Sequence, residues 1–248
     1  MRPYLSLCLL AYNERGSIES GARRCAGALT ACGQTYELVL VDDGSTDGTA
    51  EIIDALAAEL PHCRSIHHPR NLGIGAGVRT CYFQTQGEWA TWFPADMQAD
   101  PAELPRLLSH LPHCDVLATY RDPNRRQAGR LRKLISFTDR MLVRLLFGLD
   151  LHDLHWIRFF RREILERMRL SSRSPSIDTE MMVQAKRLGA RILQVPLNDH
   201  ARQSGEAKGA TLKNVVLSVT DLLALRLRPM RLDPARAESS VAENKRAG

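Results

Sequence analysis

Short apolar runs alternate with amphipathic, helix-like segments along the first 120 residues of the chain. The apolar runs predict strands at 4–11, 36–43, 63–69, 89–96 and 114–120, of which the third is the weakest. Helical spacing between them predicts helices at 17–33, 47–60, 74–86 and 101–111. Gly33 ends the first helix, Asp47 is expected to cap the second, and Pro101 suits the first turn of the fourth. This alternation predicts an α/β fold in which helices cover both faces of a mostly parallel sheet.

The second half of the chain is predicted to be more helical. Helices are expected at 132–148, 176–189 and 210–232, with one strand at 191–197. The first of these helices places Leu134, Phe137, Met141 and Leu145 along one face, with arginines elsewhere. Such a helix suits either a core-facing position or the surface of a membrane, and the sequence leaves both open. Helix 210–232 shares this pattern, and the polar tail 233–248 is predicted to be disordered.

Composition limits the class of protein. The chain has 248 residues, and no apolar run reaches the roughly 18–20 residues that a membrane-spanning helix needs. The apolar run at 4–11 is too short for the core of a secretory signal. The six cysteines are scattered without a CxxC pair, which favours a reduced, cytoplasmic protein over a disulfide or zinc framework.

Basic charge is concentrated between residues 121 and 173. The whole chain has 34 Lys and Arg against 28 Asp and Glu, a formal charge of +6. A basic region of this kind suits an anionic partner, such as phospholipid headgroups, a phosphorylated substrate or nucleic acid, or it is simply a solvated face. No nucleic-acid-binding motif accompanies the charge, so nucleic acid is not expected as a partner.

Polar clusters follow three of the predicted strands. They read AYNE at 11–14, VDDGS at 41–45 and PADMQ at 94–98. Ligands of parallel sheets bind beyond the carboxyl ends of the strands, so the three clusters predict one site. Within it, Asp42 and Asp43 are placed to accept hydrogen bonds from a nucleobase or a ribose, whereas Asp47 better fits an Asx turn.

The glycines of NLGIGAGV, residues 71–78, do not form a dinucleotide-binding fingerprint. Gly73, Gly75 and Gly77 have the spacing GxGxG rather than GxGxxG, and they precede a good strand rather than follow one. A backbone turn that lies close to a diphosphate or a sugar fits them better.

The ordered set of motifs resembles family-2 glycosyltransferases with a GT-A fold. AYNE, VDDGSTDGT, HHPRNLGIGAGVRTC, PADMQADP, RFFRREIL and HARQSGEAKG occur in the order and at the approximate spacing of that family. The set is most similar to the branch of dolichyl-phosphate mannosyltransferases and other polyprenyl-phosphate glycosyltransferases, over about residues 4–225. The resemblance implies one domain, 1–232, with a nucleotide-binding half at 1–120 and an acceptor-binding half at 121–232.

The resemblance also implies which residues hold the donor. These are Tyr12, Glu14, Asp42, Asp43, Arg70, Gly73, Ala95, Asp96, Gln98, Arg202 and Lys208. In the family, a D-A-D-x-Q stretch holds a divalent metal, so Asp96 and Gln98 are the expected ligands of Mg²⁺ or Mn²⁺. Pro94 replaces the first acid of that stretch and offers no side-chain ligand, which leaves Asp100 as a possible substitute. The alternative is that Asp96 and Asp100 cap the following helix.

Acceptor contacts are expected from DLHWIRFFRRE, residues 153–163. The resemblance implies that Arg158 meets an acceptor phosphate, for which a planar guanidinium is well suited. Trp156 stands where the family keeps a glycine and His155 where it keeps a small polar residue, so Trp156 either stacks on a sugar or narrows the site. Arg130 and Arg132 are further acceptor-binding candidates.

Asp178 has two possible roles. It is a candidate general base if the acceptor is a neutral hydroxyl, and a positioning residue if the acceptor is a phosphate, which is already an anion. Glu180 either joins it or serves as a favourable charge in the first turn of the helix. His200, Arg202 and Lys208 lie in a glycine-containing loop that either closes over the donor diphosphate or remains an exposed basic loop.

The leading hypothesis is an inverting, metal-dependent glycosyltransferase with Asp96, Asp178 and Arg158 as catalytic residues. It moves a hexose from a UDP- or GDP-linked donor to a polyprenyl-phosphate or dolichyl-phosphate lipid, and it acts as a cytoplasmic protein attached peripherally to the membrane face. One alternative keeps the donor but uses a soluble hydroxyl acceptor, with Asp178 as base. Another is a nucleotide-sugar-binding protein without catalysis. A homodimer is compatible with the sequence.

Overall fold

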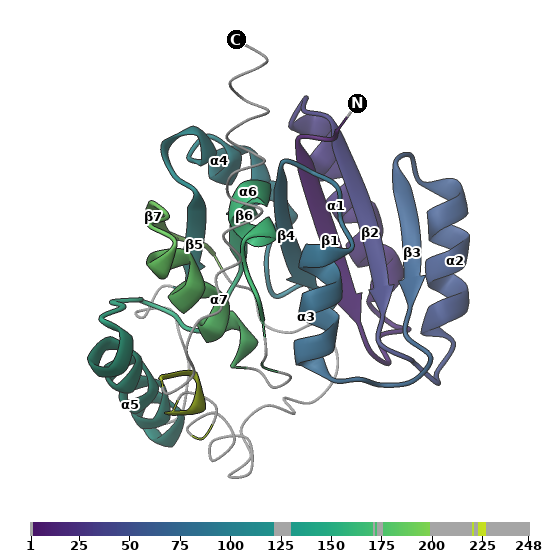
Figure 1. The fold of residues 1–248 in the computed structure, drawn as a ribbon. Coiled ribbons are helices and arrows are strands. Elements are labelled where there is room, and N and C mark those ends of the chain that lie inside the picture. The colour runs from purple at the N-terminus through teal and green to yellow at the C-terminus, as the bar shows by residue number, and fades with distance from the viewer. Residues whose placement is uncertain are drawn as a thin grey trace.

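The computed structural model describes residues 2–121, 130–170, 172, 176–198, 220 and 223–226, and its centre is one seven-stranded sheet (Figure 1). The strand order is β3-β2-β1-β4-β6-β5-β7. The strands are β1 (Leu5–Ala11), β2 (Tyr36–Asp42), β3 (Cys63–His67), β4 (Trp89–Pro94), β5 (Val116–Tyr120), β6 (Arg158–Arg161) and β7 (Ile192–Pro196).

The sheet is parallel except at β6. This strand pairs antiparallel with both β4 and β5, whereas β1, β2, β3 and β4 are mutually parallel and β5 is parallel to β7. The predicted α/β class and mostly parallel sheet are confirmed. The strand predicted at 191–197 is confirmed as β7, whereas β6 was not predicted.

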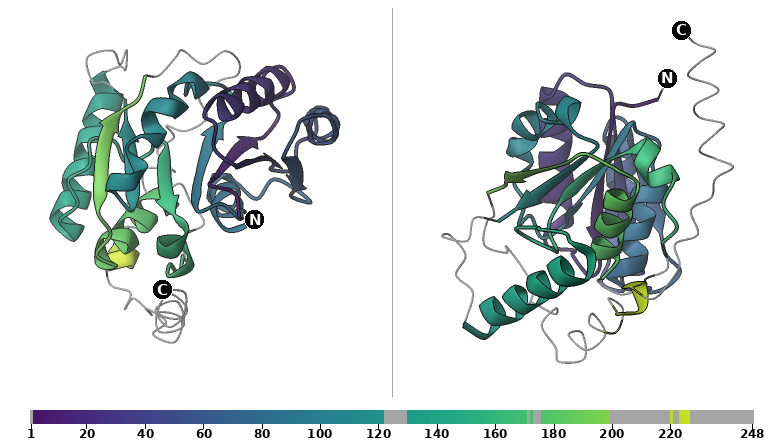
Figure 2. Two further views of the ribbon diagram at one scale, coloured as in Figure 1. Left: turned by 90° about the horizontal axis from the view of Figure 1, so that it is seen from above. Right: turned by 60° about the vertical axis from the view of Figure 1, so that its left-hand side comes forward.

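Helices cover both faces of the sheet (Figure 2). They are α1 (Ile18–Ala31), α2 (Thr49–Glu59), α3 (Ile74–Phe83), α4 (Leu104–Leu108), α5 (Arg130–Phe147), α6 (Arg162–Glu166) and α7 (Ile177–Arg187). Side chains of α1, α2 and α4 join one core cluster, and those of α3, α5, α6 and α7 join the other. Alternate residues of β1 supply the two clusters, with Leu7 and Leu9 on one face and Cys8 and Leu10 on the other.

Two predicted helices differ from the structure, one in its continuity and one in its N-cap. The helix predicted at 101–111 is divided into a 3-10 turn (Pro101–Glu103), the short α4 and a second 3-10 turn (Leu111–His113). Prolines recur in this stretch, and each lacks the N–H that a continuous helix requires. The N-cap residue of α2 is Gly48, not Asp47, whose Oδ1 instead accepts a hydrogen bond from the Thr49 N–H (3.1 Å) in the predicted Asx turn.

Within the described residues, no helix has both the length and the apolar character that crossing a bilayer requires.

Candidate active site at the carboxyl edge of the sheet

The loops that follow β1, β2, β3 and β4 meet at one edge, here called the carboxyl edge. They meet because the four strands run in the same direction. The structure thus brings together the three polar clusters that the sequence singles out. His67 at the end of β3, and His68 in the loop that follows, join them.

Asp43 holds the loop that follows β3. Its Oδ1 accepts hydrogen bonds from His68 Nδ1 (2.7 Å) and the Leu72 N–H (2.9 Å), and its Oδ2 accepts one from the Gly73 N–H (3.0 Å). Gly73 has a φ of +87°, which a glycine adopts readily. His68 also bonds Thr80 of α3 through Nε2 (2.8 Å). Both carboxylate oxygens of this buried acid therefore fix the backbone that leads into α3.

Asp42 is tied to the same loop through His67. Its Oδ1 accepts a hydrogen bond from the Ser45 N–H (3.0 Å), and its Oδ2 lies 3.3 Å from His67 Nδ1. His67 Nε2 lies 2.9 Å from Asp54 Oδ1 on α2. Burial lowers the pKa of His67, but the bonds to Asp54 and Asp42 outweigh it, and the net pKa is raised. The bonds from His67 and Ser65 lower the pKa of Asp54.

The loop after β1 is joined to the loop after β2. The Asn13 N–H donates to Ser45 Oγ (2.9 Å), and Asn13 Oδ1 accepts from the Thr46 N–H (2.9 Å). Glu14 Oε2 accepts a hydrogen bond from Ser17 Oγ (2.6 Å) at the start of α1. The Tyr12 ring beside them is partly exposed, as a side chain that packs on a ligand must be.

Asp96 is a buried carboxylate just beyond the end of β4. Its Oδ1 accepts a hydrogen bond from the Gln98 N–H (3.2 Å), and Met97 between them has a φ of +57°. Asp100 serves differently, because its Oδ1 caps the following 3-10 turn through the Ala102 N–H (3.0 Å) and lies 3.2 Å from Arg24 Nη2. The helix-capping role left open by the sequence is thus filled by Asp100.

The residues at this loop suit a hard divalent cation in kind but are few. Asp96 offers carboxylate oxygens and Gln98 an amide oxygen, which are the donors that Mg²⁺ and Mn²⁺ prefer. Throughout the described ranges, no three His, Cys, Asp or Glu side chains gather closely enough to hold an ion by themselves. An ion here therefore needs oxygens from a substrate, as Mg²⁺ commonly takes from phosphates.

Arg158 lies at the start of β6, 1% exposed. Its Nη2 donates to the carbonyl oxygens of Leu154 (2.5 Å) and Asp153 (3.3 Å), and its Nη1 donates to that of Trp156 (3.4 Å). Its Nη1 is also 3.7 Å from Asp178 Oδ1. Arg158 thus holds the 153–156 loop through its backbone carbonyl oxygens, and it connects that loop to Asp178 of α7.

A second arginine, Arg121, contacts side chains of the same loop. Arg121 makes a two-point ion pair with Asp153 (2.8 and 3.2 Å), and its guanidinium lies over the Trp156 ring, 4.5 Å from the centroid. Trp156 is buried in the core, and its indole N–H has no hydrogen-bond partner in the described part of the chain. The ring therefore forms a wall under Arg121 rather than an exposed stacking platform.

Asp178 is mostly buried at the first turn of α7. Its Oδ2 lies 3.9 Å from His155 Nδ1, and its Oδ1 faces Arg158. Glu180 is engaged in structure, since its Oε2 accepts from the Ser172 N–H (2.7 Å) and its Oε1 from Gln184 Nε2 (3.3 Å). Burial raises the pKa of Asp139 on α5, which the charge of His155 partly opposes.

Comparison with known proteins identifies the family. Residues 6–169 match the family described as "Glycosyl transferase family 2", which is more than half of the chain. The chain belongs to glycosyl transferase family 2. The resemblance drawn from the motifs is confirmed, and the protein is a glycosyltransferase.

Relatives and solved structures agree with this membership. The undecaprenyl-phosphate 4-deoxy-4-formamido-L-arabinose transferase of Pseudomonas paraeruginosa is 31% identical over 240 residues, covering 94% of this chain and 69% of the relative. The glucosyl-3-phosphoglycerate synthase of Mycobacterium tuberculosis bound to UDP superposes with a TM-score of 0.68 at 20% identity, over 92% of this chain and 82% of that one. The same enzyme with Mn²⁺, UDP-glucose and phosphoglyceric acid gives 0.69 at 20% identity, over 92% and 81%. This likeness confirms the GT-A fold.

Of the remaining predicted site residues of this glycosyltransferase, some are described by the structure and others lie outside its described part. Arg70 is exposed beside Gly44, and Ala95 is buried next to Asp96. Arg130 and Arg132 lie in α5, but their side chains are outside the described part, as are His200, Arg202 and Lys208 altogether. Residues 210–232 lie largely, and the tail 233–248 entirely, outside it as well. Sequence reasoning missed His67, His68 and Arg121, whose roles arise from contacts with acids 25 to 32 residues away.

Proposed function

We propose that the protein is an inverting hexosyltransferase that uses a UDP- or GDP-linked donor and a polyprenyl-phosphate lipid acceptor. An acceptor phosphate oxygen attacks the anomeric carbon, the new C–O bond forms, and the bond to the diphosphate breaks with its electrons. The nucleoside diphosphate leaves from the opposite face, so no covalent enzyme intermediate is needed. The 31% identical relative, whose name specifies undecaprenyl phosphate, carries this proposal.

The donor half of the site supports nucleotide binding. Tyr12 offers an exposed ring, and Asp42 and Asp43 fix the loops around it. Asp96 and Gln98 would hold Mg²⁺ or Mn²⁺, which when bound neutralises the charge of the departing diphosphate. Because Pro94 offers no side-chain oxygen, more of the ligands of this metal ion would come from the donor diphosphate.

The surroundings of Asp178 favour a phosphate acceptor over a hydroxyl. A general base must reach the proton that it removes and must be able to hold it. Asp178 is instead mostly buried between the cation of Arg158 and His155. An anionic acceptor needs no base, and the guanidinium groups of Arg158 and Arg121 place positive charge at the 153–156 loop. Asp178 is then a positioning residue for Arg158.

Helix α5 offers a surface for the membrane that carries such an acceptor. Phe137, Met141 and Leu145 are 52%, 49% and 80% exposed, and their spacing of four residues places them on one stripe. Val143 on the opposite side is buried, so the helix is anchored to the body while the stripe faces outward. Figure 2 shows α5 lying along the outside of the molecule. The exposure supports the membrane-surface interpretation that the sequence left open.

The direct test is a transfer assay with a polyprenyl phosphate in detergent, using UDP-glucose and GDP-mannose labelled in the sugar. We expect label to enter the organic phase with one donor and to stop when EDTA is added. The variant Asp96→Asn removes the expected metal ligand and serves as the inactive control. Label that stays in water with an added soluble alcohol would instead support the hydroxyl-acceptor alternative.

A separate measurement tests the membrane surface. Replacing Phe137, Met141 and Leu145 together by serine should abolish sedimentation with anionic phosphatidylglycerol vesicles. Transfer to a detergent-solubilised acceptor should remain, because the stripe lies outside the reacting groups. Full retention on vesicles would exclude α5 as the membrane surface without touching the proposed chemistry.

A further inference from the structure

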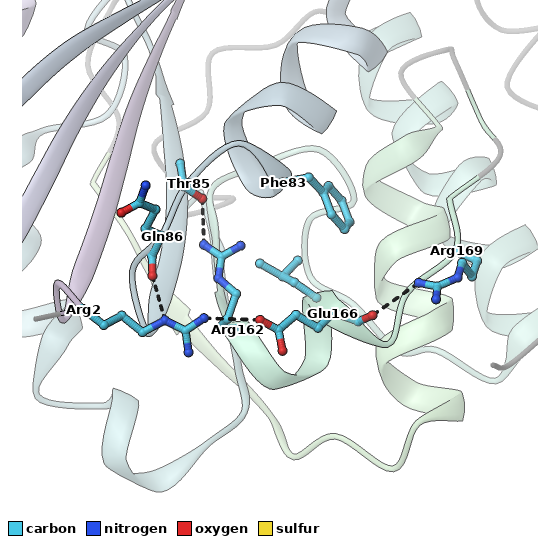
Figure 3. Close-up of a pocket in the computed structure, with 8 residues that line it drawn as sticks. Arg2, Phe83, Thr85, Gln86, Arg162, Glu166 and Arg169 are labelled. Carbon is cyan, nitrogen blue, oxygen red and sulfur yellow. Dashed lines mark hydrogen bonds and ion pairs between the residues drawn. The ribbon is translucent and has the colours of Figure 1, made fainter. Parts of the chain in front are cut away.

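A cavity of about 620 Å³ lies at the edge opposite the candidate active site, here called the amino edge. Arg2 leads into β1, Thr85 and Gln86 lead into β4, and Arg162 follows β6, which runs the other way. Figure 3 shows these side chains around the cavity together with Phe83, Glu166 and Arg169. The volume lies within the range of small-molecule sites, about 300–1,000 Å³.

Arg162 is a buried cation whose guanidinium bonds only neutral groups among the described residues. It is 5% exposed, and its three nitrogens donate to Gly87 O (3.0 Å), Tyr82 O (2.9 Å) and Thr85 Oγ1 (2.7 Å). These acceptors are neutral, and none of the described carboxylates forms an ion pair with it. Burying a charge is costly unless an opposite charge accompanies it. Each terminal nitrogen carries two N–H groups and uses one in these bonds, which leaves one on each.

Two further arginines add positive charge to the lining of the cavity around Arg162. Burial, and then the positive charge of Arg2, lowers the pKa of Arg162, and the charges of Glu166 and Glu37 partly oppose this shift. An arginine nevertheless remains protonated at neutral pH. Arg2 Nη2 lies 3.2 Å from Glu166 Oε1, the one carboxylate among the lining residues. With Arg169, the lining residues include three arginines and one glutamate, a formal net charge of two positive units.

The cavity also has an apolar wall. The Phe83 ring is a partly exposed aromatic at the end of α3, and Leu165 of α6 lines the cavity beside it. A ligand here therefore meets positive charge on one side and a hydrocarbon surface on the other.

We propose that this cavity binds a small molecule that carries a phosphate group. A phosphate monoester carries between one and two negative charges at neutral pH, close to the net charge of the lining, and its oxygens match the fork of a guanidinium. The phosphate lies against Arg162 and Arg2, and the organic part lies along Phe83. The site is separate from the sugar-transfer edge and does not rest on the function proposed there.

The test is calorimetric titration of the full chain with glycerol 3-phosphate and with inorganic phosphate, with EDTA present so that metal-dependent donor binding does not contribute. We expect saturable binding of both, with glycerol 3-phosphate the tighter because it reaches Phe83. The double variant Arg2→Gln, Arg169→Gln should weaken binding by at least about tenfold, because the loss of even one of its two charged groups costs about that factor. Arg162 is left unchanged because it holds three backbone and side-chain oxygens.

The matched control is Arg167→Gln, an exposed arginine just beyond α6 that does not line the cavity. This variant has lost one positive charge and should bind as the wild type does. Equal binding by the double variant would place the anion elsewhere and overturn the proposal. Heats that sodium chloride at equal ionic strength reproduces would overturn it as well, since they would reflect general screening.

Discussion

Two glycines with nearly the same backbone angle give a direct measure of how tightly the donor loops pack. Gly44 has a φ of +69° and Gly33 a φ of +66°, so alanine at either position pays the same left-handed penalty of roughly 1–2 kcal/mol. A Cβ on Gly33 meets open space. A Cβ on Gly44 lies 2.2 Å from the carbonyl carbon of Arg70 and 2.6 Å from the Asn71 nitrogen.

The difference between the two alanine variants therefore isolates this contact. Carbon atoms pack at about 3.5–4.0 Å, so Gly44→Ala must displace the 70–73 backbone by more than about 1 Å. Overpacking of this kind costs about 1–3 kcal/mol beyond the shared penalty. Urea unfolding should show Gly44→Ala less stable than Gly33→Ala by that amount.

Function should separate the two variants further. The displaced backbone is the one that Asp43 holds through Leu72 and Gly73, so the donor site moves with it. A displacement of about 1 Å at a site costs on the order of a hundredfold in rate. The sugar-transfer rate of Gly44→Ala should fall by about that factor, while Gly33→Ala keeps its rate. Equal stability and equal rates in the two variants would refute the packing argument.

Three further predictions concern pH, the acceptor side and the metal. The ion pair of His67 and Asp54 should stabilise the fold most between about pH 4 and 6.5. The raised pKa of His67 gives stability that is lost as pH rises through it, and the lowered pKa of Asp54 gives stability that is lost as pH falls through it. A double-mutant cycle with His67→Gln and Asp54→Asn should therefore show less coupling at pH 8.5 than at pH 6. Arg121→Gln breaks a largely buried ion pair with Asp153 and should lower the free energy of unfolding by about 3 kcal/mol. It should also raise the KM for the acceptor while the calorimetric Kd for UDP stays unchanged. Pro94→Asp restores a carboxylate beside Asp96 and should tighten Mn²⁺ binding in the absence of nucleotide, measured by electron paramagnetic resonance; unchanged affinity would show that position 94 does not face the ion.

The first half of the fold follows from local pattern, and so do α5, α7 and β7 of the second half, whereas β6 and α6 do not. The strands and helices up to α3 were predicted within a few residues because their apolar runs are long and bounded by turn residues. β6 has four residues, two of them arginines, and it becomes a strand only because β4 and β5 flank it. The same holds for the site. The acids at the strand ends and Arg158 were predicted from motifs, whereas His67, His68 and Arg121 reach their acid partners only through tertiary contacts.

The proposed donor and acceptor halves of the carboxyl edge are held by different interactions. In the donor half, carboxylates accept backbone N–H groups of the neighbouring loops, so the loops themselves are the rigid element. In the acceptor half, Arg158 and Arg121 hold one loop through its carbonyl oxygens and its Asp153 side chain. Trp156 fills the space between them, so a smaller residue there opens a cavity under Arg121 without loosening a donor contact. We propose that acceptor choice depends on position 156 and that a substitution there leaves the proposed nucleotide site as it is.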